Sequence, residues 1–136
     1  MSRENVEVVR RIYDAVARRD IVTPFELYAD DIVWDLSNTR RAALYAKSVY
    51  VGHEGVRENW RESLAAFGSV DLDVQGLTDT GDHVLATIRE REIGRTSGVP
   101  VETTHFAVWT LANDKVVRMQ VFDDWEAAAA AAGSRS

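Results

Sequence analysis

A chain of 136 residues, 46% of them hydrophobic, can build one core without disulfides or metals, so we expect a single domain over 1–136. The absence of cysteine excludes thiol catalysis and cysteine-bound metals, and the net charge of −6 argues against nucleic acid, because binding to a phosphate backbone needs clustered basic side chains. No apolar run is long enough for a signal sequence or a membrane span, so we expect a soluble cytoplasmic protein that does not bind membranes.

The first half of the chain predicts three helices and one strand. Residues 6–20 and 54–67 repeat apolar side chains every three to four positions, which is typical of amphipathic helices, and a Thr-Pro pair at 23–24 begins a short helix between them. Residues 31–36 alternate as a first strand. Residues 37–53 show no clear period and predict a long loop with room for a short helix; long loops in compact domains are often functional.

The second half predicts an antiparallel sheet, because apolar residues there alternate with polar ones. Glycine-rich and Asn-Asp turns join the last three strands as hairpins. An alanine-rich run at 124–133 predicts a short C-terminal helix. Long twisted strands curl around a helical layer, so the chain predicts an α+β fold with a concave pocket. The four expected strands cover residues 70–75, 83–93, 99–112 and 115–123.

The alternation in the last strand indicates which side chains face the pocket. Met119 and Val121 point to the apolar side, and Asp123 follows with the same parity. A three-residue turn at 112–114 keeps the preceding strand in a register that brings His105 towards Asp123.

Four segments, in their order and spacing, resemble the SnoaL-like branch of the nuclear transport factor 2-like superfamily. They read VEVVRRIYDAVARRD, LYADDIVWDL, GHEGVRENW and HFAVWTLANDKVVRMQVFDDWEAAAAAAG. The match covers nearly the whole chain and implies a cone-shaped, mainly antiparallel sheet wrapped on two to three N-terminal helices, with a short C-terminal helix. Relatives include polyketide cyclases, ketosteroid isomerase-like proteins and limonene epoxide hydrolase-like proteins, so the resemblance implies a small hydrophobic ligand.

The catalytic positions that the resemblance implies are mostly apolar in this chain. The general base of the isomerases falls at Leu36 and their oxyanion acid at Ala107, while the aspartate of the cyclases falls nearest to Val121. Tyr13 is the one oxyanion donor that can be retained, and Glu90 is the one carboxylate left of the hydrolase set. Chemistry does not transfer with the fold, so each residue has to be weighed by itself.

Three residues are candidate catalytic acids or bases: Asp123, His105 and Glu90. A carboxylate in a partly dry apolar pocket keeps its proton to higher pH, and imidazole titrates near neutrality, so both types can transfer protons there. Each has a structural alternative. Asp123 can instead cap the C-terminal helix, His105 can be a structural histidine, and Glu90 can be a solvated strand residue paired with a neighbouring arginine.

A set of large side chains predicts a wall for an apolar ligand, although aromatic residues at core spacing also build the core. The loop residues Arg40, Arg41 and Lys47 can close over an acidic ligand or remain a solvated basic surface. The histidines lie far apart without ligand spacing, so no metal and no cofactor are expected. The candidate substrate-binding residues are Tyr13, Trp34, Trp60, Trp109, Met119 and Val121.

Two functions stay open, and the sequence does not decide whether the protein is an enzyme. One is a cofactor-independent cyclase or isomerase that acts on a polyketide- or steroid-like substrate by acid/base chemistry. The other is a non-catalytic ligand carrier or sensor. A third alternative, a dimeric interaction module, rests on Phe106, Val108 and Phe122, which we expect on an exposed outer sheet face that forms a homodimer in every case.

Overall fold

The computed structural model describes residues 2–68, 70–93 and 98–133. Each helix and strand predicted from the sequence is present there. The 37–53 loop holds a 3-10 helix, in keeping with the short helix for which it had room, and a short edge strand that the sequence did not predict. The elements are α1 (Ser2–Ala17), α2 (Thr23–Leu27), β1 (Tyr28–Asp35), η1 (Arg40–Leu44), β2 (Val49–Val51), α3 (Gly52–Phe67), β3 (Val70–Asp79), β4 (His83–Ile93), β5 (Pro100–Ala112), β6 (Lys115–Phe122) and α4 (Trp125–Ala131).

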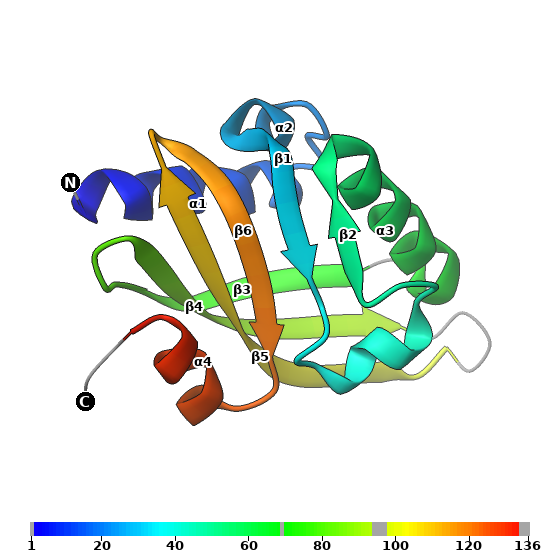
Figure 1. The fold of residues 1–136 in the computed structure, drawn as a ribbon. Helices are drawn as coiled ribbons and strands as arrows, with labels where there is room; N and C mark the ends of the chain where they lie inside the picture. Colours follow the sequence, from blue (N-terminus) through cyan, green and yellow to red (C-terminus); the bar gives the residue numbers. More distant parts are fainter. Residues whose placement is uncertain (1, 69, 94–97, 134–136) are drawn as a thin grey trace.

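One six-stranded sheet organises the fold, in the order β2-β1-β6-β5-β4-β3. All neighbouring strands are antiparallel except β1 and β6, which run parallel. Figure 1 shows the long strands curving across the molecule, with α1 and α3 on one side of the sheet and α4 by the end of β6. The predicted α+β class with a curved, mainly antiparallel sheet is therefore confirmed. None of the described helices is both long and apolar enough to span a membrane.

The helices on the concave side are placed by their apolar stripes. On α1, Val9 and Ile12 are 0% and 1% exposed, and on α3 Val56 is 0% exposed, so the predicted helical spacing corresponds to the buried faces. These residues share one core with the inward side chains of the sheet. Packing helices against a curved sheet leaves space between the layers where the sheet bends away.

The hairpin between β5 and β6 differs from the expected one. Asn113 and Asp114 both adopt positive φ, of 54° and 64°, and they alone form the turn, so the predicted three-residue turn at 112–114 is wrong. A register shift beside Thr110 leaves Val117 as an extra residue in β6. The extra residue shifts the register by one, so Trp109 and Met119 still face the same side of the sheet, as they would with a three-residue turn.

The apolar outer patch is covered, which the sequence did not indicate. Val108 is 0% and Phe122 6% exposed, because α4 lies over them and packs its own fully buried Ala128 against them. Phe106 packs edge to face against Trp125, with 5.8 Å between the ring centroids. The expectation that this patch is exposed in a monomer is therefore wrong, and the homodimer stays a prediction without that support.

Candidate functional site

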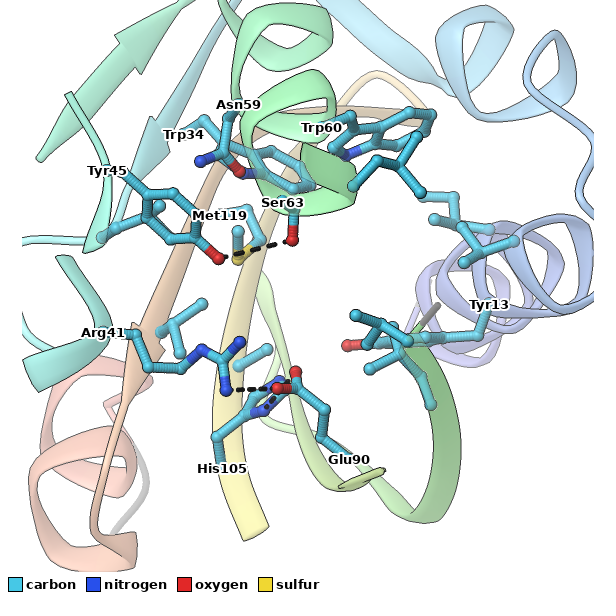
Figure 2. A pocket seen from close by; sticks show the side chains of 18 of the residues that line it. Tyr13, Trp34, Arg41, Tyr45, Asn59, Trp60, Ser63, Glu90, His105 and Met119 are labelled. Atoms are coloured by element: carbon cyan, nitrogen blue, oxygen red, sulfur yellow. Dashed lines mark hydrogen bonds and ion pairs between the residues drawn. The ribbon is translucent and has the colours of Figure 1, made fainter. Parts of the chain in front are cut away.

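A cavity of about 560 Å³ lies between the concave side of the sheet, α1, α3 and the loop that carries η1, a volume typical of ligand pockets. Figure 2 shows Trp34 and Trp60 on one side of the open space and Arg41, Glu90 and His105 on the opposite side. The cavity lining includes all the predicted substrate-binding residues, namely Tyr13, Trp34, Trp60, Trp109, Met119 and Val121.

The aromatic wall is fixed by its own hydrogen bonds. The indole N–H of Trp34 donates to Asn59 Oδ1 at 3.2 Å, and the indole N–H of Trp109 donates to the Tyr13 hydroxyl at 3.1 Å. The rings of Tyr13 and Trp109 also pack edge to face, with 5.5 Å between their centroids. Because both indole N–H groups are satisfied within the wall, both indoles add apolar surface to the cavity while remaining part of the core.

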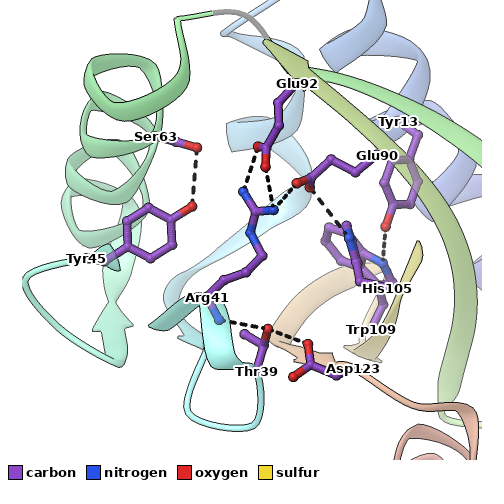
Figure 3. A network of polar contacts seen from close by, with 10 residues as sticks. All are labelled: Tyr13, Thr39, Arg41, Tyr45, Ser63, Glu90, Glu92, His105, Trp109 and Asp123. Carbon is purple, nitrogen blue, oxygen red and sulfur yellow. Dashed lines mark hydrogen bonds and ion pairs between the residues drawn. The ribbon is translucent and has the colours of Figure 1, made fainter. Parts of the chain in front are cut away.

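The opposite wall carries a buried charge cluster. Arg41, from η1, donates two hydrogen bonds of 3.1 and 2.9 Å to the Glu92 carboxylate and forms an ion pair with Glu90 (Figure 3). Glu90 and Glu92 stand two residues apart on β4, so their side chains share the inward face. The side chains of Arg41, Glu90 and Glu92 are 20%, 8% and 10% exposed, so one partly buried guanidinium pairs with two carboxylates that are more deeply buried.

His105, on β5, completes this cluster. Its Nδ1 lies 3.5 Å from Glu90 Oε1. Burial raises the pKa of Glu90 to about 7, although the adjacent Arg41 opposes the shift. Burial, and then the positive charge of Arg41, lowers the pKa of His105 to about 4. At neutral pH the imidazole is uncharged and Glu90 lies close to its own pKa, which suits a group that both accepts and donates a proton.

Asp123 does not line the cavity. Its carboxylate accepts a hydrogen bond of 2.7 Å from the Thr39 hydroxyl and one of 3.0 Å from the backbone N–H of Arg40. Burial favours the protonated form, but these bonds outweigh it and lower the pKa of Asp123. Asp123 and His105 influence each other electrostatically, yet within the described residues no hydrogen bond or ion pair joins them. The inward orientation expected for Asp123 is therefore wrong.

The alternative for Asp123, a cap on the C-terminal helix, is wrong as well, because the neighbouring residue is the cap. Asp124 is the N-cap of α4, and its carboxylate accepts a hydrogen bond of 2.9 Å from the backbone N–H of Ala127. The loop between β6 and α4 thus gives neighbouring aspartates different partners.

The burial of the charge cluster corrects two further interpretations. Glu90 is not a solvated strand residue, since it is 6% exposed and pairs with an arginine from a distant loop. Arg41 likewise does not belong to a solvated basic surface, whereas the side chain of Arg40 is 96% exposed. Sequence reasoning missed Glu92, although its parity with Glu90 was an available signal. No sequence signal distinguished Arg41 from Arg40, because the loop has no period.

Other polar groups complete the lining. The Tyr45 hydroxyl and the Ser63 hydroxyl lie 3.4 Å apart across the gap between the loop and α3. Among the residues that the structure describes, no group of three or more histidines and acids could hold a metal ion. The site's own side chains offer a carboxyl group, an imidazole and hydroxyl groups beside an aromatic wall.

A curved, mainly antiparallel sheet packed on helices around a cavity with an aromatic wall is the architecture of the nuclear transport factor 2-like class. Within that class, residues 9–119 match the model of the SnoaL-like domain, and the chain belongs to that family. No curated protein sequence matches the chain significantly.

Solved structures of the same fold are numerous. An NTF2-like protein of unknown function from Burkholderia pseudomallei K96243 superposes with a TM-score of 0.80 at 20% identity, over 89% of this chain and 91% of that chain. TerC, co-crystallised with polyporic acid, gives 0.79 at 20% identity over 96% and 99% of the two chains. A protein assigned as a SnoaL-like polyketide cyclase from Jannaschia sp. CCS1 gives 0.72 at 19% identity over 99% and 95%. At such identities the similarity shows the fold alone.

Proposed function

We propose that this protein is a cofactor-independent cyclase or isomerase that moves protons on a hydrophobic, polyketide- or steroid-like substrate held in the cavity. The observation that carries the proposal is the Glu90–His105 pair, whose atoms lie 3.5 Å apart at the cavity wall with both groups largely buried. Family membership and a structural relative co-crystallised with polyporic acid support a small-molecule ligand.

Glu90 is the proposed acid/base group. As a carboxylate it can accept a proton from a carbon next to a carbonyl group, and as a carboxylic acid it can return that proton to another position. Arg41 stays paired with Glu92 at 2.9 Å throughout, so it can orient Glu90 without leaving its place. His105, uncharged at neutral pH, can exchange a hydrogen bond with Glu90 as its protonation changes.

The role of Asp123 in this proposal is positional. It contacts Thr39 and the backbone of Arg40 rather than the cavity, so it can act on a substrate only through the loop that carries Arg41. We therefore assign proton transfer to Glu90 and His105, and to Asp123 the role of holding the loop that carries Arg41.

A ligand carrier or sensor is the second candidate. Leu36, Ala107 and Val121, which stand where relatives place catalytic acids, all line the cavity as apolar residues. A pocket so lined can bind an apolar molecule without changing it. The two functions differ in one measurable respect: removal of the Glu90 carboxylate abolishes proton transfer in an enzyme, whereas in a carrier it alters affinity only.

Proton exchange on a bicyclic ketone tests the proposal. With 2-tetralone in D₂O followed by proton NMR, we expect the protein to accelerate loss of the signals of the protons next to the carbonyl. Glu90→Gln should reduce that acceleration by at least about 100-fold, the usual contribution of a general acid or base. Glu102→Gln is the matched control, since Glu102 also pairs with an arginine but its side chain is 46% exposed. Binding without faster exchange would support the carrier instead.

A further inference from the structure

The largely buried arginine of the cavity already has carboxylate partners before a ligand enters. Arg41 faces two carboxylates: it donates hydrogen bonds to Glu92 and forms an ion pair with Glu90. The other arginine of the lining, Arg19, pairs with Asp71 at 3.4 Å, and its side chain is 62% exposed. The interior of the cavity therefore offers no guanidinium that lacks a carboxylate partner within the described residues.

The same interior contains hydrogen-bond donors. The Tyr13 hydroxyl accepts from the indole N–H of Trp109, and within the described part of the chain no acceptor takes its own hydrogen. Burial keeps Tyr13 protonated by raising its pKa, so the hydroxyl remains a neutral donor. Glu90, drawn just below the Tyr13 hydroxyl in Figure 2, supplies a second donor whenever it is protonated. The polar end of the pocket thus provides donors without a free positive charge.

We propose that the cavity selects uncharged aromatic or polycyclic ligands that carry a carbonyl-type oxygen, and that it discriminates against carboxylates of the same ring system. This ligand class rests on the proposed function in using the same cavity, but it does not require turnover. It replaces the sequence-based alternative in which Arg41 closes over an acidic ligand.

The physical reason is the cost of burying charge. A carboxylate leaving water needs a cation, and here the nearest cation is shared by two carboxylates that repel a third negative charge. A carbonyl oxygen is far less costly to desolvate and requires only one or two donors, which Tyr13 and protonated Glu90 supply. An acidic ligand could enter only by displacing Glu90 or Glu92 from Arg41.

Three probes with one ring system test this selectivity by isothermal titration calorimetry at pH 7: methyl 2-naphthoate, 2-naphthoate and 2-ethylnaphthalene. The ester and the acid differ in charge, and the hydrocarbon lacks the oxygen. We expect the ester to bind at least about tenfold more tightly than 2-naphthoate and more tightly than the hydrocarbon. A carboxylate that binds as tightly as the ester would overturn the inference.

Freeing Arg41 should reverse the preference. In the double variant Glu90→Gln with Glu92→Gln, Arg41 lacks a carboxylate partner among its present contacts, so 2-naphthoate should bind more tightly than the ester. Glu102→Gln, which removes an exposed carboxylate from the Arg89 pair, should leave the wild-type order unchanged. If the double variant fails to fold by circular dichroism, Glu92→Gln alone should narrow the gap between ester and acid; an unchanged gap would contradict the inference.

The failures of the two proposals can be told apart. Ester binding with the expected preference, but without Glu90-dependent proton exchange on 2-tetralone, would refute the enzyme and leave the ligand class intact. Equal binding of ester and acid, together with that exchange, would refute the ligand class alone. If none of the three probes binds, the ligand class is refuted as well.

Discussion

The Thr39 hydroxyl donates a hydrogen bond of 2.7 Å to Asp123, 84 residues further along the chain, and so ties the end of β6 to the start of η1. Asp123 also accepts from the backbone N–H of Arg40, and Thr39 Oγ1 accepts from the backbone N–H of Arg41 at 3.2 Å. Asp123 therefore holds the first turn of η1, and this turn places the Arg41 side chain against Glu90.

Asp123→Ala should release this attachment. We expect a loss of roughly 1 kcal/mol in unfolding free energy from the hydrogen bonds, and a higher titration midpoint for Glu90, because Arg41 lowers that pKa less when it is held less firmly. Carbon-13 NMR of the Glu90 carboxyl measures the midpoint. Asp124→Ala, which removes the α4 cap, is the control: it should destabilise by a similar amount and leave Glu90 unchanged. An unchanged Glu90 midpoint in Asp123→Ala would show that Asp123 does not position Arg41.

Glu90 and His105 should oppose one another in the pH dependence of stability. The native state raises the pKa of Glu90 from 4.5 to about 7, so it holds a proton that the unfolded chain releases, and stability falls as pH rises through that interval. It lowers the pKa of His105 from 6.5 to about 4, so stability falls as pH drops through that interval. Between pH 4.5 and 6.5 the two slopes have opposite signs and largely cancel.

Single variants should separate these slopes in urea unfolding measured from pH 4.5 to 7.5. Relative to wild type, Glu90→Gln should gain stability as pH rises, by up to roughly 3 kcal/mol for a shift from 4.5 to about 7 at about 1.4 kcal/mol per unit. His105→Gln should gain stability as pH falls below 6.5. Difference curves that are flat for both variants would contradict the burial of these two groups.

The Tyr13–Trp109 hydrogen bond should be visible in a double-mutant cycle. Tyr13→Phe leaves the buried indole N–H of Trp109 without its acceptor at 3.1 Å, which we expect to cost about 1–3 kcal/mol in unfolding free energy. In Trp109→Phe the donor is gone, so adding Tyr13→Phe should cost less than it does in wild type. Strict additivity of the two changes would indicate that the bond contributes nothing to stability.

Helix α4, which covers the outer face of the sheet at Val108 and Phe122, should control self-association. Ala128→Asp places a charge on a fully buried position of α4, so the helix should detach and expose Val108 and Phe122, and light scattering should report dimers or larger species. Ala130→Asp, on the exposed side of the same helix, is the matched control and should leave the mass of wild type unchanged. The same measurement on wild type tests the homodimer prediction directly, and a purely monomeric wild type would refute it.

The sequence by itself determined the elements and most of the pocket wall. Apolar residues every three to four positions mark α1 and α3, and alternation marks β3–β6, because these periods follow from local backbone geometry. The inward facing of Met119 and Val121 followed from the same alternation. Turn chemistry at Asn113 and Asp114 identified a hairpin, although not its length or the bulge that compensates for it.

Only the tertiary structure decided which charged groups meet. Arg41 lies in a segment without a period, and nothing local distinguishes it from Arg40. Yet Arg41 pairs with Glu90 and Glu92 with its side chain only 20% exposed, whereas the side chain of Arg40 is 96% exposed. The direction of Asp123 was likewise set by Thr39, a partner 84 residues away. Such contacts depend on where a loop crosses a curved sheet, and that position results from the packing of the whole domain rather than from any short stretch of sequence.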